Sequence, residues 1–211
     1  MKKIYSFVFL LVLIPVVVAA QVPAKSGRLS RGSKGFGFYG SVSAKGGLGS
    51  SGADDTNVVD SRDHYRYGAE ATLGLRYGAF LIGASGEYNL WKQKTKPSKV
   101  DDTNMSGRQI NIAPIAGLSL GPFLLLGKTH LKSTMTLDKK SAGGDEVVYT
   151  SPSMPGYSAQ LNYKIGSMSF IGVEYSSITY KKVEVDGESD KLDSKNQVTY
   201  SGWGLVYGFM F

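Results

Sequence analysis

The sequence predicts an all-β protein, an eight-stranded antiparallel transmembrane β-barrel, and three observations lead to this fold class. From residue 35 to the carboxy terminus, side chains alternate between apolar and polar almost throughout, which is the period of a β-strand. After the first 20 residues, no apolar stretch approaches the ~20 residues that a membrane-spanning helix needs. The connections between the alternating stretches are short and long in strict turn. Strands are therefore the expected structural unit.

The first 20 residues have the organisation of a secretory signal peptide. Lys2 and Lys3 precede an apolar run from Ile4 to Val18, and the small residues Ala19 and Ala20 follow. The apolar run is interrupted by a proline and is marginal in length for a transmembrane helix. We therefore expect residues 1–20 to be a signal peptide that is cleaved after Ala20.

Residues 21–34 are expected to form a basic periplasmic N-terminal tail, and the barrel is assigned to residues 35–211. The chain has a net charge of +7, but its first 34 residues contain six of the 24 lysines and arginines and no acidic residue. From residue 35 onward, 18 basic residues are balanced by 17 acidic residues. This distribution indicates a basic tail rather than a basic domain, so nucleic acid is not an expected partner. The sequence contains no cysteine, which excludes disulfides and thiolate metal sites.

Eight alternating stretches follow in chain order: 36–44, 65–75, 80–90, 109–120, 124–135, 157–164, 169–180 and 202–211. One face of each stretch carries aromatic and aliphatic residues, among them Phe36 and Phe38; Tyr65 and Leu73; Phe80 and Tyr88; Ile110 and Ile112; Leu125, Leu131 and Met135; Tyr157 and Leu161; Ile171 and Val173; Trp203 and Leu205. The other face carries small or polar residues, among them Ser41, Ser43 and Lys45; Arg66 and Glu70; Glu87 and Asn89; Gln109 and Asn111; Lys128, His130 and Lys132; Gln160 and Lys164; Glu174; Gly204 and Gly208. Stretches of about ten residues suit tilted membrane-spanning strands.

The connections sort into two kinds that alternate along the chain. Three are short and contain glycine, at 76–79, 120–122 and 164–167. Four are long and polar, at about 47–63, 92–106, 137–150 and 181–196. Outer-membrane barrels have short periplasmic turns and long external loops, so this order favours a membrane barrel over a soluble sandwich.

The two faces of the strands indicate a barrel that is apolar outside and polar inside. The interior of an eight-stranded barrel has room for side chains only, and the large aromatic residues would overfill it. We therefore expect the glycine-rich, polar faces to line the lumen and the apolar faces to contact lipid. Aromatic residues also cluster near the strand ends, as in the two interfacial girdles of such barrels: Phe36, Phe80, Phe123, Phe209 and Phe211 near the turns, and Tyr65, Tyr67, Tyr88 and Tyr157 near the loops.

The end of the chain carries the most specific motif, Tyr207-x-Phe209-x-Phe211. With the eight alternating stretches, it resembles the small eight-stranded outer-membrane β-barrels of Gram-negative bacteria, the OmpA/OmpX type. The resemblance covers about residues 35–211. It implies a location in the bacterial outer membrane, with outer-membrane lipid and lipopolysaccharide as surroundings. It also implies that the terminal motif is the signal presented to the barrel assembly machinery.

Charged residues on the lumen faces predict an internal ion network. Glutamates come from three strands and lysines from two others; the set is Glu70, Glu87, Glu174, Lys128, Lys132 and Lys164. Charges in a narrow lumen must be paired or hydrated, because uncompensated burial costs several kcal/mol. We expect carboxylate–ammonium contacts that fill the barrel, and the sequence leaves open which glutamate meets which lysine.

Three motifs with chemical associations do not support catalysis or cofactor binding. The stretch 121–129 resembles a phosphate-binding loop, but five residues rather than four separate its glycines, and Pro122 lacks an N–H. The repeated "DDTN" at 54–57 and 101–104 lacks the glycine and closing glutamate of a calcium loop. The deacylase barrels of similar size place a serine two residues from the histidine, whereas Lys132 follows His130 at that spacing. We therefore expect no enzymatic activity and no cofactor or metal.

The expected function is surface display by a filled barrel, through four loops with a structural, adhesive or other interaction role. One loop is locally basic through Lys92, Lys94, Lys96 and Lys99, and this patch could contact lipopolysaccharide phosphates or other polyanions. The alternative is a narrow, porin-like diffusion channel for ions or small solutes, which would require the charged plug to open. A lipid A-modifying enzyme ranks below both, because no catalytic constellation is visible.

Overall fold

The computed structural model describes residues 36–52, 62–93, 105–138, 144–151, 154, 156–194 and 196–211. The expected signal peptide and basic tail lie outside these residues. The described residues form twelve strands: β1 (Phe36–Gly52), β2 (Arg62–Tyr77), β3 (Phe80–Gln93), β4 (Met105–Leu120), β5 (Phe123–His130), β6 (Lys132–Leu137), β7 (Val147–Ser151), β8 (Gly156–Lys164), β9 (Ser169–Tyr180), β10 (Lys182–Val185), β11 (Glu188–Lys191) and β12 (Val198–Met210). Across this part of the chain, no helix has the length and apolarity to cross a membrane.

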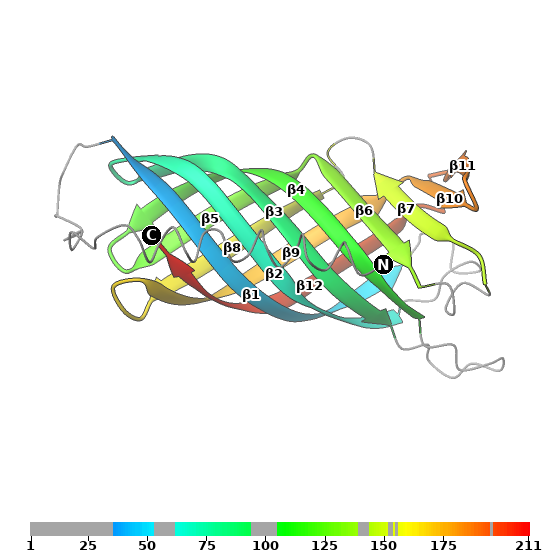
Figure 1. Cartoon of the computed structure of the whole chain (residues 1–211), viewed down its shortest axis with the longest axis horizontal. Helices are drawn as coiled ribbons and strands as arrows, with labels where there is room; N and C mark the ends of the chain where they lie inside the picture. Colours follow the sequence, from blue (N-terminus) through cyan, green and yellow to red (C-terminus); the bar gives the residue numbers. More distant parts are fainter. Residues whose placement is uncertain are drawn as a thin grey trace, which may run out of the picture.

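The strands close into a single antiparallel barrel, which confirms the predicted fold class (Figure 1). Each of β1 to β4 pairs with its neighbours along the chain, and β1 also pairs with β12 from Ser41↔Met210 to Gly52↔Thr199. The barrel has eight strand positions because three of them are composite: β5 with β6, β7 with β8, and β9 with β10. Closure leaves no open edge of β1 or β12 along these pairs, as a hydrocarbon environment requires.

The strands β1 to β4 run without interruption for 14 to 17 residues. Two-residue turns connect β2 to β3 at Gly78 and β4 to β5 at Gly121, whose φ angles are 59° and 60°. Glycine reaches this left-handed region without the penalty that a Cβ atom imposes. The short turns therefore fall where the sequence predicts them, and Figure 1 shows them at one end of the barrel.

A β-bulge at Leu131 separates β5 from β6. Lys128 pairs with Ile115 of β4, and Lys132 pairs with Ile112, so four steps on one strand oppose three on the other. The amide of Leu131 donates to the carbonyl of Ile112 at 2.9 Å within this bulge. One extra residue reverses the faces beyond it, so Lys132 is exposed and Met135 is buried. The sequence pattern had predicted the reverse, with Lys132 in the lumen and Met135 on the outer face, and both predictions were wrong because of the extra residue.

A second irregularity separates β7, which ends at Ser151, from β8, which begins at Gly156. Gly156 pairs with Ile178, whereas Thr150 pairs with Lys182. Between these two pairs the chain advances six residues on the β7–β8 side and only four on the β9–β10 side. On the loop side of this irregularity the sheet continues from β6 of the barrel wall through β7 and β10 to β11, and Figure 1 shows β10 and β11 projecting furthest among the strands. Parts of 137–150 and 181–196, expected to be loops, are therefore strands.

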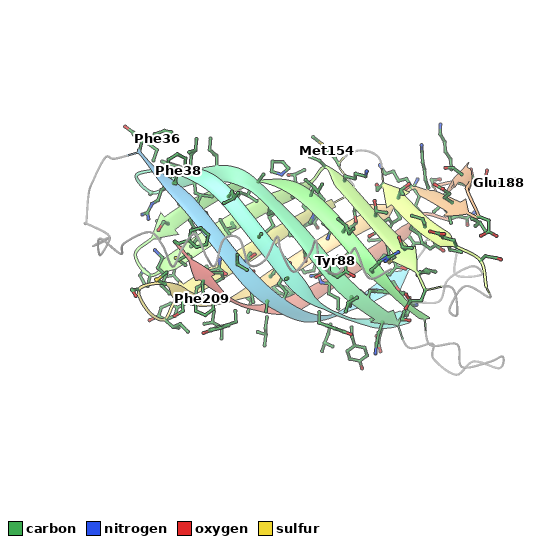
Figure 2. All side chains as sticks on the ribbon, viewed as in Figure 1. Phe36, Phe38, Tyr88, Met154, Glu188 and Phe209 are labelled. Atoms are coloured by element: carbon green, nitrogen blue, oxygen red, sulfur yellow. The ribbon has the colours of Figure 1, made fainter. Side chains whose placement is uncertain are left out.

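The outer face of the barrel is apolar, as predicted. Phe38, Trp203 and Leu205 have exposed fractions of 90%, 65% and 65%. Figure 2 shows Phe36, Phe38 and Phe209 around the turn end and Glu188 at the opposite end. The predicted girdle residues Tyr65, Tyr67 and Tyr157 are likewise exposed. This surface suits hydrocarbon rather than water.

The interior is layered rather than polar throughout. An apolar cluster fills the turn end: Tyr39, Leu81, Ile115, Leu124 and Leu126. A second fills the loop end: Trp91, Met135, Leu137, Ile178 and Tyr180. The buried charged side chains of the lumen lie between these two clusters, whereas two buried amides lie level with or beyond them: Asn162 pairs with Leu124, and Gln93 follows Trp91 on β3. The expectation of a polar lumen therefore holds, with an apolar cluster at each end of it.

Candidate functional site: the filled lumen and the loop end

Lys45 lies at the centre of the middle layer. Its Nζ atom contacts Glu70 Oε2 at 2.8 Å, Glu87 Oε1 at 3.1 Å and Glu174 Oε2 at 2.7 Å. The side chain of Lys45 is 4% exposed. Alternation along β1 directs Lys45 inward in phase with Ser41 and Ser43, which are also buried. One ammonium group from β1 thus joins carboxylates from β2, β3 and β9.

Lys128 is the second bridging cation and comes from β5. Its Nζ atom contacts Glu70 Oε1 at 2.6 Å and also contacts Glu174 Oε2. It donates a further hydrogen bond to Gln160 Oε1 of β8 at 2.6 Å. Glu70 and Glu174 therefore each lie between the two lysines, which makes the contacts one network rather than separate pairs.

Amides and one arginine complete the network. Asn89 and Asn111 each donate to one oxygen of Glu87, at 2.9 and 3.1 Å. Arg66 Nη2 lies 3.5 Å from Glu174 Oε1 on the loop side of the layer. The network therefore contains three carboxylates and three cations, with every charged side chain 10% exposed or less. Balanced charge and additional hydrogen bonds are the conditions under which buried ions are tolerated.

The structure brings Glu70, Glu87, Glu174 and Lys128 together, but it does not bring the other two predicted lysines to them. Lys132 follows the bulge and is exposed. Lys164 ends β8, six residues beyond Ser158, the partner of Lys128, and is therefore about 20 Å away along the strand. Lys45 and Arg66 take their places in the network. The sequence held a signal for both: Lys45 lies on the same face of β1 as Ser43, and Arg66 lies on the same face of β2 as Glu70.

The loop-end cluster seals the lumen above the charged layer. Tyr180 accepts a hydrogen bond from Gln109 Nε2 at 2.8 Å, and its hydroxyl lies 2.8 Å from Ser133 Oγ. The ring of Tyr200 packs edge-on against Trp91 and His64, with centroids 5.4 and 5.6 Å apart. Edge-to-face packing of this kind is favourable for aromatic pairs. Rings from β2, β3, β9 and β12 thus meet across the barrel.

The remaining predicted residues lie on or near the surface. Tyr207, Phe209 and Phe211 face outward at the turn end and are about half exposed. Lys92 is exposed at the loop end of β3, whereas Lys94, Lys96 and Lys99 lie outside the described residues.

His130 is buried in the lumen, with Nε2 2.7 Å from Ser158 Oγ. His130 is thus a hydrogen-bonded histidine of the lumen face, where the alternation of the sequence places it. No group of three or more potential metal-binding histidine or acidic side chains occurs within the described part of the chain.

Comparison with known proteins supports the fold. Neither a protein-family model nor a curated protein matches the sequence. The structure of Ail, the attachment invasion locus protein of Yersinia pestis, in complex with the heparin analogue sucrose octasulfate, matches with a TM-score of 0.51 and 16% identity over 82% of this chain and 99% of that chain. Neisserial surface protein A matches with a TM-score of 0.51 and 15% identity over 82% of this chain and 97% of that chain. The protein therefore has the eight-stranded barrel fold of these small outer-membrane proteins.

Proposed function

We propose that the protein is a bacterial outer-membrane barrel that is closed by its own side chains and displays its loop end for contact with external molecules. The observation that carries this proposal is the filling of the lumen in three layers. The charged layer alone joins side chains from β1, β2, β3, β5 and β9. A solute crossing the barrel would have to separate these ion pairs and displace both apolar clusters.

The loop end supports display because ordered structure continues beyond the barrel. The strand β7 continues the barrel wall by pairing with β6 and also pairs with β10, which pairs with β11; every residue of β11 is exposed. The hairpin between β10 and β11 turns at Asp186 and Gly187, with φ angles of 49° and 91°. Two such residues suit the type I′ turn that matches strand twist. The sheet therefore presents a defined surface rather than an unstructured loop.

Anionic polymers are the ligand class that we propose for the loop end. The loop that begins at Lys92 carries the four lysines of the predicted basic patch, and each would contribute about 1 kcal/mol near an anionic surface. The complex of Ail with a heparin analogue supports the same class. Lipopolysaccharide phosphates are the natural polyanions of this surface.

Planar-bilayer conductance of the folded protein tests the closed lumen. We expect no discrete conductance steps from wild-type protein, because the lumen side chains are paired and packed. Reproducible steps that disappear when the protein is heat-unfolded would contradict the proposal and make the protein a channel.

Binding of sucrose octasulfate and heparin tests the display function. We expect replacement of Lys92, Lys94, Lys96 and Lys99 by Gln to weaken binding and to reduce its dependence on salt. The matched control replaces Lys181, Lys182 and Lys191 of the protruding sheet by Gln. Equal binding by the wild type and the four-lysine variant would exclude the basic loop, and loss only in the control would move the site to the sheet.

A further inference from the structure

Three exposed cations lie on the lipid-facing wall of the neighbouring strands β3, β4 and β6. Alternation turns Lys92 of β3 and Arg108 of β4 outward. Lys132 of β6 faces outward after the bulge at Leu131. A charged side chain on a wall that contacts hydrocarbon is unfavourable unless its charged end reaches the interface or a counter-ion. The three cations therefore favour an anion at this part of the wall.

Strand pairing places the three cations around one small area. Lys92 pairs with Ser106, two residues from Arg108, so Lys92 and Arg108 are diagonal neighbours about 7–8 Å apart. Arg108 pairs with Thr136, which lies four residues beyond Lys132 on the same face, or about 13 Å along the strand. Lysine and arginine have long side chains, so the three charged ends can reach different groups of one anionic head group.

Apolar side chains next to the cations place them at the boundary of the hydrocarbon. The exposed Ile112 pairs with Lys132. The exposed Leu90 pairs with Arg108 and, on its other side, with Tyr67 of the loop-end girdle. Girdle residues mark the level at which hydrocarbon gives way to head groups. The cations therefore lie where acyl chains end and head groups begin.

Two exposed carboxylates also lie near this area, on its loop side. Asp63 lies two residues beyond the partner of Lys92 on β2, and Asp138 lies two residues beyond the partner of Arg108 on β6. Asp138 accepts a hydrogen bond from Ser106 Oγ at 2.5 Å. Among the described residues, neither carboxylate forms an ion pair with the three cations. The positive side of this charge pattern therefore faces the membrane, and its negative side faces the external water.

We propose that Arg108 and Lys132, with Lys92 beside them, bind the phosphorylated head group of one lipopolysaccharide molecule. Its acyl chains would cover the exposed Ile110 and Ile112. Phosphate is the anion that the external leaflet supplies at this level, and arginine and lysine form strong charge-assisted hydrogen bonds with it. The site rests on the membrane location proposed above. It lies on the barrel wall, whereas the proposed polyanion contact uses the loop that begins at Lys92.

Native mass spectrometry of the folded protein in detergent micelles tests the site with two forms of one lipid. The probes are lipid A with both phosphates and lipid A of the same acyl chains without phosphates. We expect the wild type to retain one bisphosphorylated molecule and at least tenfold less of the other form. Arg108→Gln with Lys132→Gln should lower retention about thirtyfold, because each basic residue contributes a factor of roughly five at an anionic surface. Lys182→Gln with Lys191→Gln on the protruding sheet removes the same charge and should leave retention unchanged.

Each outcome bears on the wall site separately from the proposed function. Equal retention of the two lipid A forms by the wild type would overturn the site without the use of any variant. Equal retention by the wild type and the Arg108–Lys132 variant would also overturn it, as would an equal loss in the control. Loss only on replacement of Lys94, Lys96 and Lys99 would assign the phosphates to the basic loop, which overturns the wall site and keeps the polyanion contact. Failure of the wild type to insert into liposomes of outer-membrane lipid would contradict the membrane location itself. Heat-dependent gel mobility would establish that each variant is folded.

Discussion

The two halves of the barrel differ in how regularly they are built. The strands β1 to β4 run unbroken and pair in one register along their length. Between Gly121 and β12, each strand position is divided into two strands: β5 and β6 at the bulge of Leu131, β7 and β8 between Ser151 and Gly156, and β9 and β10 at Lys181. The irregular half is also the half that extends into the protruding sheet. Alternation assigns a side chain to a face only while the register is unbroken.

The two halves nevertheless meet in one ion network. Lys45 comes from the regular half and Lys128 from the irregular half, and both contact Glu70 and Glu174. The bulge at Leu131 directly follows His130, on the loop side of Lys128. The pairing of β4 with the next strand position is thus regular from the turn end up to the charged layer, and it shifts by one residue on the loop side of that layer.

Deletion of Gly86 from β3 should have the largest effect on this comparison. The regular strand β3 has no extra residue to absorb the loss, so the residues beyond the deletion turn to the opposite faces, with Glu87 and Trp91 outward. We expect the variant to fail to refold, as measured by loss of the heat-modifiable band in detergent. Deletion of Leu131 is the control and should refold, because it removes the extra residue of the bulge and leaves β6 on its present faces and with its present partners on β4. Failure of the Leu131 deletion to refold would mean that the bulge itself is required.

Replacement of Lys128 by Met should have the next largest effect. It leaves Glu70 and Glu174 with less counter-charge, and breaking a buried ion pair costs roughly 3–5 kcal/mol. The free energy of unfolding in urea would measure the loss. Lys132→Met is the matched control, because this lysine lies four residues away but is exposed, and a change within about 0.5 kcal/mol is expected. Similar losses in the two variants would contradict the register change between them.

Truncation of Met135 should destabilise the loop-end cluster by a smaller amount. Met135 is fully buried, and Met→Ala at such sites costs about 2–5 kcal/mol, with the lower part of the range expected where neighbours can relax. Met154, between the two interrupted strands, is 69% exposed, so Met154→Ala is the control. Urea unfolding followed by tryptophan fluorescence would report the change, because Trp91 lies in the same cluster. An unchanged midpoint for Met135→Ala would mean that the cluster adds little to stability.

Replacement of Gly187 by Ala should have the smallest effect, and a local one. Its φ angle of 91° lies in the left-handed region, where a Cβ atom costs roughly 1–2 kcal/mol. We expect faster amide hydrogen exchange in β10 and β11 and no change in the urea midpoint of the barrel. The control Gly86→Ala places a Cβ atom in open space without a positive φ angle. A lower urea midpoint for the whole barrel in Gly187→Ala would show instead that the protruding sheet and the barrel unfold together.

The sequence predicted the regular half better than the irregular half for a physical reason. Alternation and the turn glycines identified the strands, the faces and the three network carboxylates. The bulge at Leu131 left no local signal, because an extra residue is defined by pairing with β4 rather than by residue type. Two other features did leave signals: Pro152 and Pro155 lack the N–H that a continuous strand donates, and Asp186-Gly187 is typical of a hairpin turn.

The charged layer is built from strands that lie far apart in the chain, and this bears on how the barrel can assemble. Lys45 and Glu174, which are in direct contact, are 129 residues apart in the chain. The three carboxylates lie on β2, β3 and β9, so their counter-charges are complete only when the first and last strands have met. A partly closed sheet would carry unpaired ions into hydrocarbon, at a cost of several kcal/mol for each ion. We therefore expect insertion and closure of this barrel to be coupled, because closure supplies the missing counter-charges.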